Sequence, residues 1–205
     1  MTLPMAPLVA HITAVEPENG AMAVLKEQIG KNGIANITTI QKRWEDINIL
    51  QDLDEPYDLV IASYSLDMPH MKDAIEKMCA VSRKWVYLTW ANRISTMEQR
   101  QIDLWPKLYG REYYPKPKAN ILYNLLNDMG IYPNVKTEHR NYLQKFPDIE
   151  TAVRKFKKTL DISATEGESV IRDYLVTKFE YKNNEYSLLN RQVVATLWWD
   201  VSETG

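Results

Sequence analysis

The sequence predicts an α/β protein built on an open, mostly parallel Rossmann-like sheet with helices on both faces. Over residues 11–90, short β-branched or apolar runs alternate with helical patterns in the order strand, helix, strand, loop, strand, helix, strand. The run 57–62 (YDLVIA) is nearly all apolar, which is typical of a strand buried on both faces of a parallel sheet. Because crossovers between parallel strands are right-handed, this order leaves few topologies.

Size and composition indicate one ordinary globular domain spanning residues 1–205. Hydrophobic residues make up 45% of the chain and charged residues 25%, the values of a soluble protein with a sizeable core. The formal net charge is −2, so the sequence offers no electrostatic case for nucleic acid or an anionic membrane as a partner.

Cysteine and histidine usage points to a reduced compartment and against a metal centre. Cys79 is the one cysteine and cannot form an internal disulfide, so we expect a cytoplasmic protein. No apolar run approaches the length of a membrane span, and no signal peptide is visible. No cluster of His, Cys and Asp has metal-ligand spacing, so no metal site is expected.

The first strand is predicted at residues 11–15 and ends at Glu16, followed directly by Pro17. The helix after it has one apolar face and two candidate terminating glycines: Met22, Leu25 and Ile29, then Gly30 and Gly33. A strand that stops at a carboxylate beside a helix start is a site for a ribose, because the carboxylate accepts both hydroxyl protons of the sugar. The alternative is a solvated strand end.

The next three strands are predicted at residues 36–40, 57–62 and 85–90. The second strand leads into the acidic segment 43–46 (RWED). Between the third and fourth strands, a helix is predicted from an apolar stripe: Met71, Ile75, Met78 and Cys79.

The second half of the chain departs twice from this alternation of strands and helices. Residues 91–118 are irregular and are interpreted either as a lid inserted into the domain or as a surface excursion. After a helix at 119–129, strands are expected at 134–142 and 192–199. The region 145–190 would then be an insert between these last two strands. It contains an amphipathic helix, a shorter helix and a hairpin around residues 183–184.

With these motifs, the chain resembles the class I S-adenosylmethionine-dependent methyltransferases. The usable motifs lie in residues 1–90, and the rest agrees only in the order of its elements. The resemblance implies that Glu16 binds the ribose of S-adenosylmethionine and that Trp44 and Glu45 contact its adenine. It also implies that Ala62 and Ser63 line the methionine side of the cofactor, and that the last two strands form an antiparallel pair at one sheet edge.

The resemblance further implies a small-molecule acceptor, because residues 63–66 (SYSL) replace the Asn-Pro-Pro-Tyr type of sequence of amino-directed DNA and protein enzymes. The family transfers the methyl group in line from a sulfonium, so the enzyme mainly supplies positioning and desolvation. No catalytic base stands out. Tyr64 and His70 lie nearest the expected methyl-transfer end, and Tyr113 and Tyr114 are candidates for the acceptor pocket wall.

The main departure from the family is the absence of its first strand and glycine-rich loop. Only 15 residues precede Glu16, none of them glycine, so the domain is expected to be N-terminally truncated and its activity impaired. The missing strand belongs between the second and fourth family strands, here 11–15 and 57–62. Either these two strands pair directly, or a second copy covers the edges in a homodimer, or the chain is a truncated product of a longer gene.

Two other functions are compatible with the sequence. A chain without the glycine loop can persist as a non-catalytic remnant or interaction module. A nicotinamide-nucleotide-binding oxidoreductase also places an acid on a ribose at the end of its second strand, but it needs the same loop and does not normally end in an antiparallel edge pair.

Overall fold

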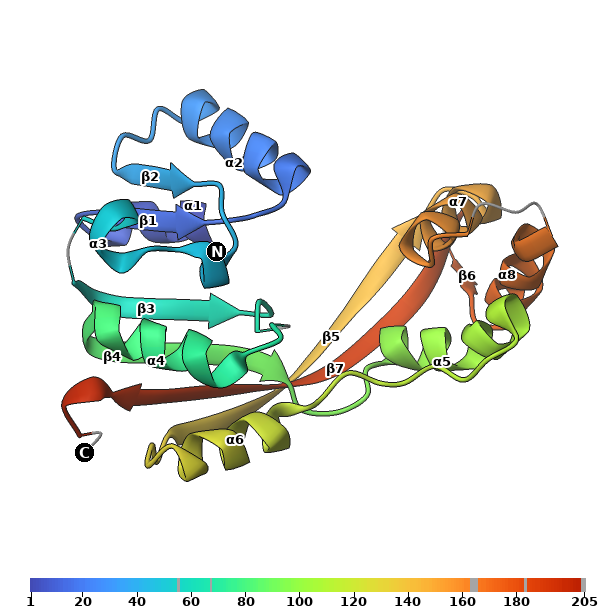
Figure 1. Cartoon of the computed structure of the whole chain (residues 1–205). Coiled ribbons are helices and arrows are strands. Elements are labelled where there is room, and N and C mark those ends of the chain that lie inside the picture. Colours follow the sequence, from blue (N-terminus) through green and yellow to red (C-terminus); the bar gives the residue numbers. More distant parts are fainter. Residues whose placement is uncertain (55, 67, 163–165, 183, 204–205) are drawn as a thin grey trace. The chain divides into compact units, whose positions relative to one another are not determined.

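The computed structural model describes the chain except for residues 55, 67, 163–165, 183 and 204–205 (Figure 1). The described residues form two compact units. The first comprises Met1–Ile61, Ser65–Val86 and Asp200–Glu203. The second comprises Ala62–Tyr64 and Tyr87–Trp199.

The first unit contains the predicted alternation of strands and helices. Its elements in chain order are α1 (Thr2–Met5), η1 (Ala6–Leu8), β1 (Ile12–Val15), α2 (Asn19–Lys31), β2 (Ile37–Ile40), η2 (Trp44–Asp46), α3 (Ile49–Asp52), the start of β3 (Tyr57–Ser63), α4 (Met71–Val81), the start of β4 (Ser82–Ala91) and η3 (Val201–Glu203). β1 and β2 pair in parallel, in a register that places Ile12 opposite Ile37 and Val15 opposite Ile40. The sequence therefore located these strands correctly.

Helix α2 begins at a carboxylate cap and ends at a glycine. The side chain of Glu18 accepts a hydrogen bond from the amide of Ala21, which satisfies one free donor of the first turn. Gly30 remains inside the helix, whereas Gly33 follows it with φ of +63°. Gly33 is thus the residue whose left-handed backbone ends the turn, and the expectation that Gly30 ends the helix is wrong.

Helix α4 buries the face that its sequence predicts. Ile75 and Met78 are buried, as expected, together with Ala74 and Val81. Trp44 packs against this helix from the loop after β2, where its indole Nε1 donates to the backbone oxygen of Ala74 over 3.0 Å.

Strand β3 is less buried than its composition predicts. Leu59 and Ile61 are 37% and 36% exposed, so the expectation of a strand buried on both faces is wrong. The reason lies in the sheet topology. β1 and β2 form a sheet of their own, and β3 is the first strand of a five-stranded sheet with the order β3-β4-β7-β5, in which β6 also pairs with β7.

The direct pairing of β1 with β3, one of the three expected solutions for the missing strand, does not occur among the described residues. Each of these strands keeps one edge without a strand partner there. The side chains along β3 consequently have a neighbouring strand on only one side.

The second unit is built around two long strands. Its elements are the end of β4, α5 (Thr96–Tyr109), α6 (Ala119–Asp128), β5 (Asn134–Phe146), α7 (Ile149–Thr159), α8 (Glu166–Val176), β6 (Glu180–Lys182) and most of β7 (Glu185–Asp200). β5 and β7 pair antiparallel from Asn134 opposite Trp198 to Phe146 opposite Tyr186. The predicted edge pair is confirmed, but both strands extend beyond their expected ends at 142 and 192.

The hairpin within the predicted insert is also confirmed. β6 pairs antiparallel with β7, with Tyr181 opposite Tyr186. Asn184 has φ of +64°, the left-handed conformation that Asn tolerates in such turns.

Helix α5 occupies half of the segment 91–118, which the sequence pattern predicts to be irregular. Its N-cap, Ser95, accepts a hydrogen bond from the amide of Glu98, and Gly110 ends it with φ of +65°. Ser and Glu three residues apart form a capping-box sequence, which is a helix-start signal within the sequence. Pro106 lies inside the helix, and its presence favoured the prediction of an irregular segment over that of a helix.

A hydrophobic core forms between α5, α7, α8 and the far ends of β5 and β7. Its buried members are Leu104, Phe146, Ala152, Val153, Leu160, Ile171, Leu175 and Leu188. Residues of the predicted insert 145–190 therefore share a core with α5, which lies outside it.

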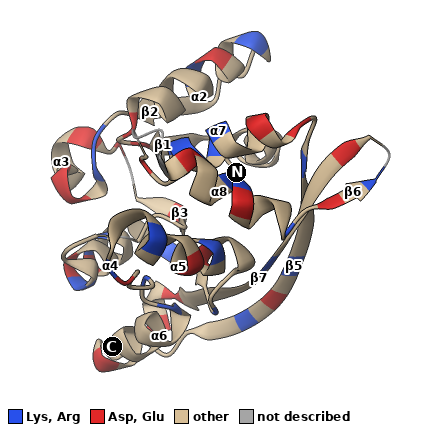
Figure 2. Ribbon diagram, turned by 90° about the vertical axis from the view of Figure 1, so that its right-hand side faces the viewer, with Lys and Arg blue, Asp and Glu red and all other residues tan. Residues whose placement is uncertain are grey.

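Charges of both signs are interspersed along most of the helices and strands (Figure 2). None of the helices in the described part of the chain is long and apolar enough to cross a membrane. Within the same residues, no group of three or more His, Cys, Asp or Glu side chains is placed to hold a metal ion.

Candidate functional site

The C-terminal ends of β1 and β2 lie side by side and bring the two acidic strand ends to one edge of the first unit. The amide of Glu16 donates to the backbone oxygen of Ile40 over 3.1 Å, which extends the parallel ladder by one residue. The loop that carries Trp44 and Glu45 starts from the same edge, as expected for parallel strands.

The carboxylate of Glu16 is half-buried and partly engaged. Its Oε1 accepts a hydrogen bond from the amide of Glu18 over 2.9 Å, which fixes the turn into α2. Its Oε2 accepts no hydrogen bond from any residue that the structure describes. One oxygen therefore orients the carboxylate, and the other remains an acceptor for a hydroxyl group.

Two polar residues at this edge, Gln41 and Asn19, are not among the site residues that the sequence predicts. The side-chain amide of Gln41 donates to Oδ1 of Asn19, so the segment after β2 is tied to the first turn of α2. Both side chains are exposed. Amides next to a carboxylate are common ribose and base ligands, but they are equally common in loops, so only their proximity in the fold makes them candidates.

The loop of Trp44 is fixed from α4 by a lysine. Lys77 Nζ donates to the backbone oxygens of Trp44, Glu45 and Ile47 over 3.1, 2.8 and 2.9 Å. The same ammonium lies 5.8 Å from the centroid of the Trp44 ring. Three carbonyl acceptors use the three donors of the ammonium, and the half-buried indole is thereby held in a defined orientation.

Glu45 and His70 are exposed. Glu45 contributes its backbone oxygen to Lys77, as above. His70 is the N-cap residue of α4, without a side-chain hydrogen bond to the helix.

In the second unit, the end of β3 turns sharply. Ala62 is buried, Ser63 is half-buried, and Tyr64 is 45% exposed with φ of +56°. The amide of Tyr64 donates to the backbone oxygen of Thr89 over 3.0 Å, which holds this turn against β4. A positive φ in a tyrosine costs roughly 1 kcal/mol or more and is found where the surrounding structure over-determines it.

Burial raises the pKa of the Tyr64 phenol, and the positive charge of Arg140 only partly opposes this effect. Tyr64 is therefore a neutral hydrogen-bond donor near pH 7. It is not placed to act as a base by itself.

Tyr113 and Tyr114 have different surroundings. The hydroxyl of Tyr113 donates to Oε1 of Gln101 over 3.1 Å, and its ring lies edge-on to Trp105 at 5.3 Å. Tyr114 is 86% exposed. Within the second unit, Tyr113 thus belongs to the packing of α5, while Tyr114 projects into solvent.

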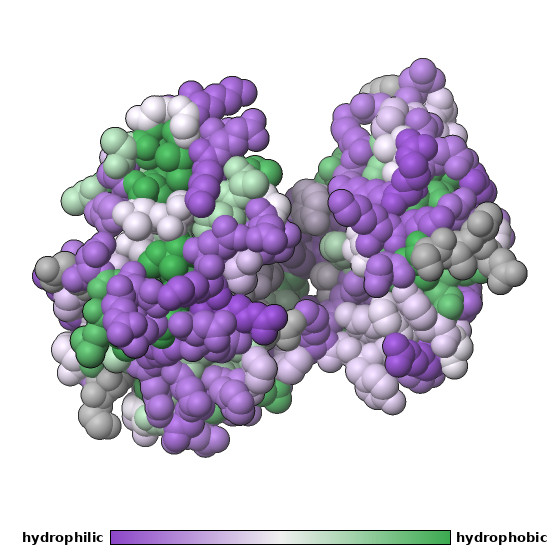
Figure 3. Space-filling view, turned by 45° about the horizontal axis from the view of Figure 1, so that its top comes forward, coloured by the Kyte–Doolittle hydropathy of each residue, from purple (hydrophilic) through white to green (hydrophobic). Residues whose placement is uncertain are grey.

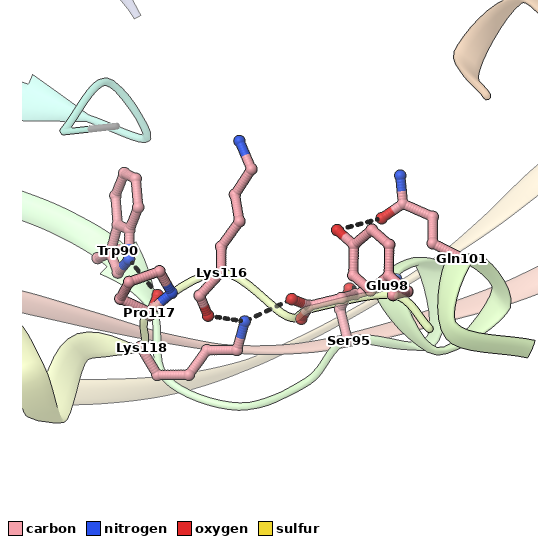
Figure 4. Close-up of polar contacts among 8 residues, drawn as sticks. Trp90, Ser95, Glu98, Gln101, Lys116, Pro117 and Lys118 are labelled. Carbon is pink, nitrogen blue, oxygen red and sulfur yellow. Dashed lines mark hydrogen bonds and ion pairs between the residues drawn. The ribbon is translucent and has the colours of Figure 1, made fainter. Parts of the chain in front are cut away.

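The segment after α5 is tied down by polar contacts (Figure 4). Trp90 Nε1 donates to the backbone oxygen of Pro117 over 2.8 Å. Lys118 Nζ lies 2.6 Å from Oε1 of Glu98 and also donates to the backbone oxygen of Lys116. Both charged side chains of that pair are mostly buried, so the end of the expected lid is anchored to the first turn of α5.

Comparison with known proteins gives relatives at low identity. No family model matches the sequence. An uncharacterized protein of Haemophilus influenzae is 26% identical over 203 residues, which cover 97% of this chain and 71% of that protein.

Solved structures resemble the whole chain. The structure of a protein from Bacillus halodurans, described as a candidate methyltransferase, matches with a TM-score of 0.58 at 13% identity, covering 96% of this chain and 85% of that one. YcgJ from Bacillus subtilis matches with a TM-score of 0.57 at 11% identity, covering 96% and 86%. At these identities the likeness concerns the fold, and it favours neither the oxidoreductase nor the non-catalytic alternative.

Proposed function

We propose that this chain, which has the fold of the class I S-adenosylmethionine-dependent methyltransferases, binds S-adenosylmethionine and methylates a small molecule. The observation that carries the proposal is the edge where β1 and β2 end, with the Glu16 carboxylate held by one oxygen and open at the other. That geometry supports a bidentate or single contact with a ribose diol.

The adenosyl end of the cofactor is assigned to the first unit. Glu16 would accept from the ribose hydroxyls, and the fixed ring of Trp44 offers an aromatic face for adenine. Glu45 is exposed beside it and would accept from a donor on the base edge. For Ala62 and Ser63, the role toward the methionine end of the cofactor stays a prediction from the sequence.

For the acceptor side, the residues that the sequence predicts remain the candidates. Tyr64 would donate a hydrogen bond to an acceptor molecule from its strained turn, and His70 is an exposed group for proton transfer. Tyr113 and Tyr114 remain candidates for pocket walls. The bound cofactor supplies the activated methyl group. The chain's own residues orient the reactants and exclude water.

The first experiment is isothermal titration of the purified chain with S-adenosylmethionine and S-adenosylhomocysteine. Micromolar binding, about −8 kcal/mol, would support the adenosyl site. Absence of binding up to millimolar would overturn cofactor binding by this chain and leave the fold unaffected.

A matched pair of variants assigns the site. Glu16→Gln removes the charge of the carboxylate, and we expect a tenfold or greater loss of affinity because a hydrogen bond to a charged group contributes about 1.5–3 kcal/mol. Glu27→Gln alters an exposed carboxylate on α2 and should leave affinity unchanged. Equal affinities of the two variants would remove Glu16 from the site.

Transfer activity is a separate measurement. An acceptor screen with the bound cofactor would identify the small molecule. Failure to transfer a methyl group to any small molecule in that screen would contradict the proposed activity.

A further inference from the structure

Strand β5 is an exposed edge strand of the five-stranded sheet. It is the last strand in the order β3-β4-β7-β5, and among the described residues it pairs only with β7. From Asn134 to Lys145 every residue is exposed except Glu138 and Gln144, which are half-buried. The strand has 13 residues, whereas an ordinary strand has about 5–6. Its outer edge is therefore a long template for another strand.

The backbone groups on this open edge can be assigned from the neighbouring strand. In β7, the amide of Arg191 donates to Oγ1 of Thr96, and the backbone oxygen of Val193 accepts from the amide of Asn92, directly after β4, each over 2.8 Å. The odd-numbered residues of β7 thus point toward β4, so its even-numbered residues bond to β5. The register pairs these with even-numbered residues of β5. The residues of β5 that direct their amides and oxygens to the open edge are consequently Val135, Thr137, His139, Asn141 and Leu143.

This strand also exposes large apolar side chains. Val135, Tyr142 and Leu143 are 48%, 49% and 55% exposed. By contrast, the face of the second unit that Figure 3 shows over α7 and α8 is mainly hydrophilic, with small hydrophobic patches. A further strand beside β5 would cover part of these three side chains, because side chains of adjacent strands contact one another across the ladder.

Charges of alternating sign follow one face of β5. Lys136, Glu138 and Arg140 share this face because alternate residues of a strand point to the same side. The carboxylate of Glu138 lies 3.0 Å from Lys136 and 2.8 Å from Arg140. Charges on an edge strand commonly prevent pairing with another chain. Because these charges alternate, they oppose such pairing in some registers and favour it in one.

Two copies of β5 can pair antiparallel around a two-fold axis if their outward-pointing residues meet. An axis at Glu138 or at Arg140 places that residue opposite itself, so like charges meet. An axis at His139 instead places Glu138 of each copy opposite Arg140 of the other, and Val135 opposite Leu143. This register overlaps residues 134–144 of both strands.

The remaining axes fit less well. An axis at Thr137 joins Lys136 to Glu138 of the other copy, but it overlaps only residues 134–140. The others bring no opposite charges together. The strand is therefore its own complement in one register, and this favours a second copy over a peptide of unrelated sequence.

From these features we propose that β5 pairs antiparallel with β5 of a second copy of this chain, around a two-fold axis at His139. The backbone ladder supplies the affinity. The two pairs of Glu138 with Arg140 select the register, since exposed ion pairs are individually weak. The homodimer that the sequence predicts would use other edges, those of β1 and β3. Pairing through β5 does not depend on cofactor binding.

The test is sedimentation of the full chain without cofactor over a range of concentrations. We expect the mass to rise with concentration toward that of two chains. Glu138→Arg and Arg140→Glu each place like charges opposite one another, and each should weaken the dimer by about tenfold or more. The double variant restores both opposite-charge pairs and should restore most of the affinity.

Glu180→Arg is the matched control, because it makes the same change of charge at an exposed residue of β6. It should dimerise as the parent does. Circular dichroism verifies that all variants are folded, and recovery in the double variant separates loss of pairing from loss of folding.

A cysteine pair tests the register directly. Hydrogen-bonded residues opposite each other have Cα atoms about 5.5 Å apart, which lies within the range of a disulfide. His139→Cys should therefore form a covalent dimer on oxidation. Thr137→Cys should not, because the two copies of this residue lie four positions apart along the ladder. The parent chain, which contains Cys79, gives the background.

Three results would overturn the proposal. The first is a monomer at all concentrations up to about 1 mM. The second is a dimer that neither charge reversal weakens, or that the double variant does not restore. The third is cross-linking of Thr137→Cys without cross-linking of His139→Cys, which would assign the dimer to another register.

Discussion

The guanidinium of Arg100 in α5 donates to Oδ1 of Asn190 in β7 over 2.6 Å, although 90 residues separate them in the sequence. A second donor of the same group reaches the backbone oxygen of Leu189 over 3.0 Å. Both side chains are buried, and burial lowers the pKa of Arg100. This charge is thus held inside the second unit by neutral acceptors.

Asn190→Leu should destabilise the chain more than Arg100→Met. Asn190→Leu leaves a buried charge without its side-chain acceptor, and we expect the free energy of unfolding to fall by about 3–5 kcal/mol, by analogy with broken buried ion pairs. Arg100→Met removes the charge and keeps an apolar side chain, so the free energy of unfolding should fall by about 1–3 kcal/mol because of the unpaired acceptors. Urea unfolding measures both.

Arg191→Ala is the control for this pair, because Arg191 is the next residue of β7 and is exposed. Arg191→Ala should change the free energy of unfolding by no more than about 0.5 kcal/mol. An equal or reversed order of the two buried variants would show that the Arg100 charge is not the dominant cost.

Lys77→Met should loosen the loop that carries Trp44. The three carbonyl contacts of the ammonium are lost, and we expect a loss of about 1–3 kcal/mol together with a red shift of Trp44 emission. Lys72→Met on the same helix changes a lysine whose ion pair with Glu76 is exposed, so it should have little effect. If Trp44 contacts adenine as proposed, only Lys77→Met also weakens S-adenosylhomocysteine binding.

Tyr64→Gly should separate stability from function. Glycine adopts a φ of +56° without strain, so relief of the left-handed conformation favours the variant by up to about 1 kcal/mol. Loss of the phenol should raise the KM for the acceptor if Tyr64 contacts it. Tyr64→Ala is the comparison, since it loses the side chain and keeps the strain. A variant with glycine that is less stable than the one with alanine would contradict this account.

The stability of the second unit should depend on pH through Asp103. Burial alone would raise the pKa of Asp103, but hydrogen bonds from Tyr174 and Gln99 lower it overall. The stability from this carboxylate is therefore present above its unfolded pKa of about 3.9 and is lost as the pH falls through the lower folded value.

Tyr174→Phe removes the stronger of these hydrogen bonds, which is 2.6 Å long. The difference in the free energy of unfolding between this variant and the parent should be largest at pH 7 and should decrease below about pH 4. Burial and the bond to Asp103 also raise the pKa of Tyr174, so the parent should lose part of this advantage again above about pH 10, the unfolded pKa of tyrosine. A difference that is constant between pH 3 and 7 would exclude the coupling.

Local signals in the sequence were enough for much of the fold. The strand ending at Glu16, the stripe around Ile75 and Met78 and the hairpin at Asn184 each depend on residues close together in the chain. Ser95 and Glu98 also indicate the start of α5. Pro106 and the tyrosine-rich stretch nevertheless favour an irregular segment there, so the sequence pattern does not predict this helix.

Long-range contacts decided what the sequence could not. The anchoring of Trp44 by Lys77 and the burial of Arg100 against Asn190 join residues more than thirty positions apart, and no local pattern encodes such pairs.

By itself, then, the sequence determined the α/β class, the acid at the end of β1 and the resemblance to a methyltransferase, because periodicity and strand-end chemistry are local properties. Only the tertiary structure decided that β1 and β3 belong to different sheets and that Leu59 and Ile61 stay partly exposed. Strand pairing depends on two segments that are distant in the sequence. An apolar run such as YDLVIA therefore does not show whether a strand pairs with one of its edges or with both.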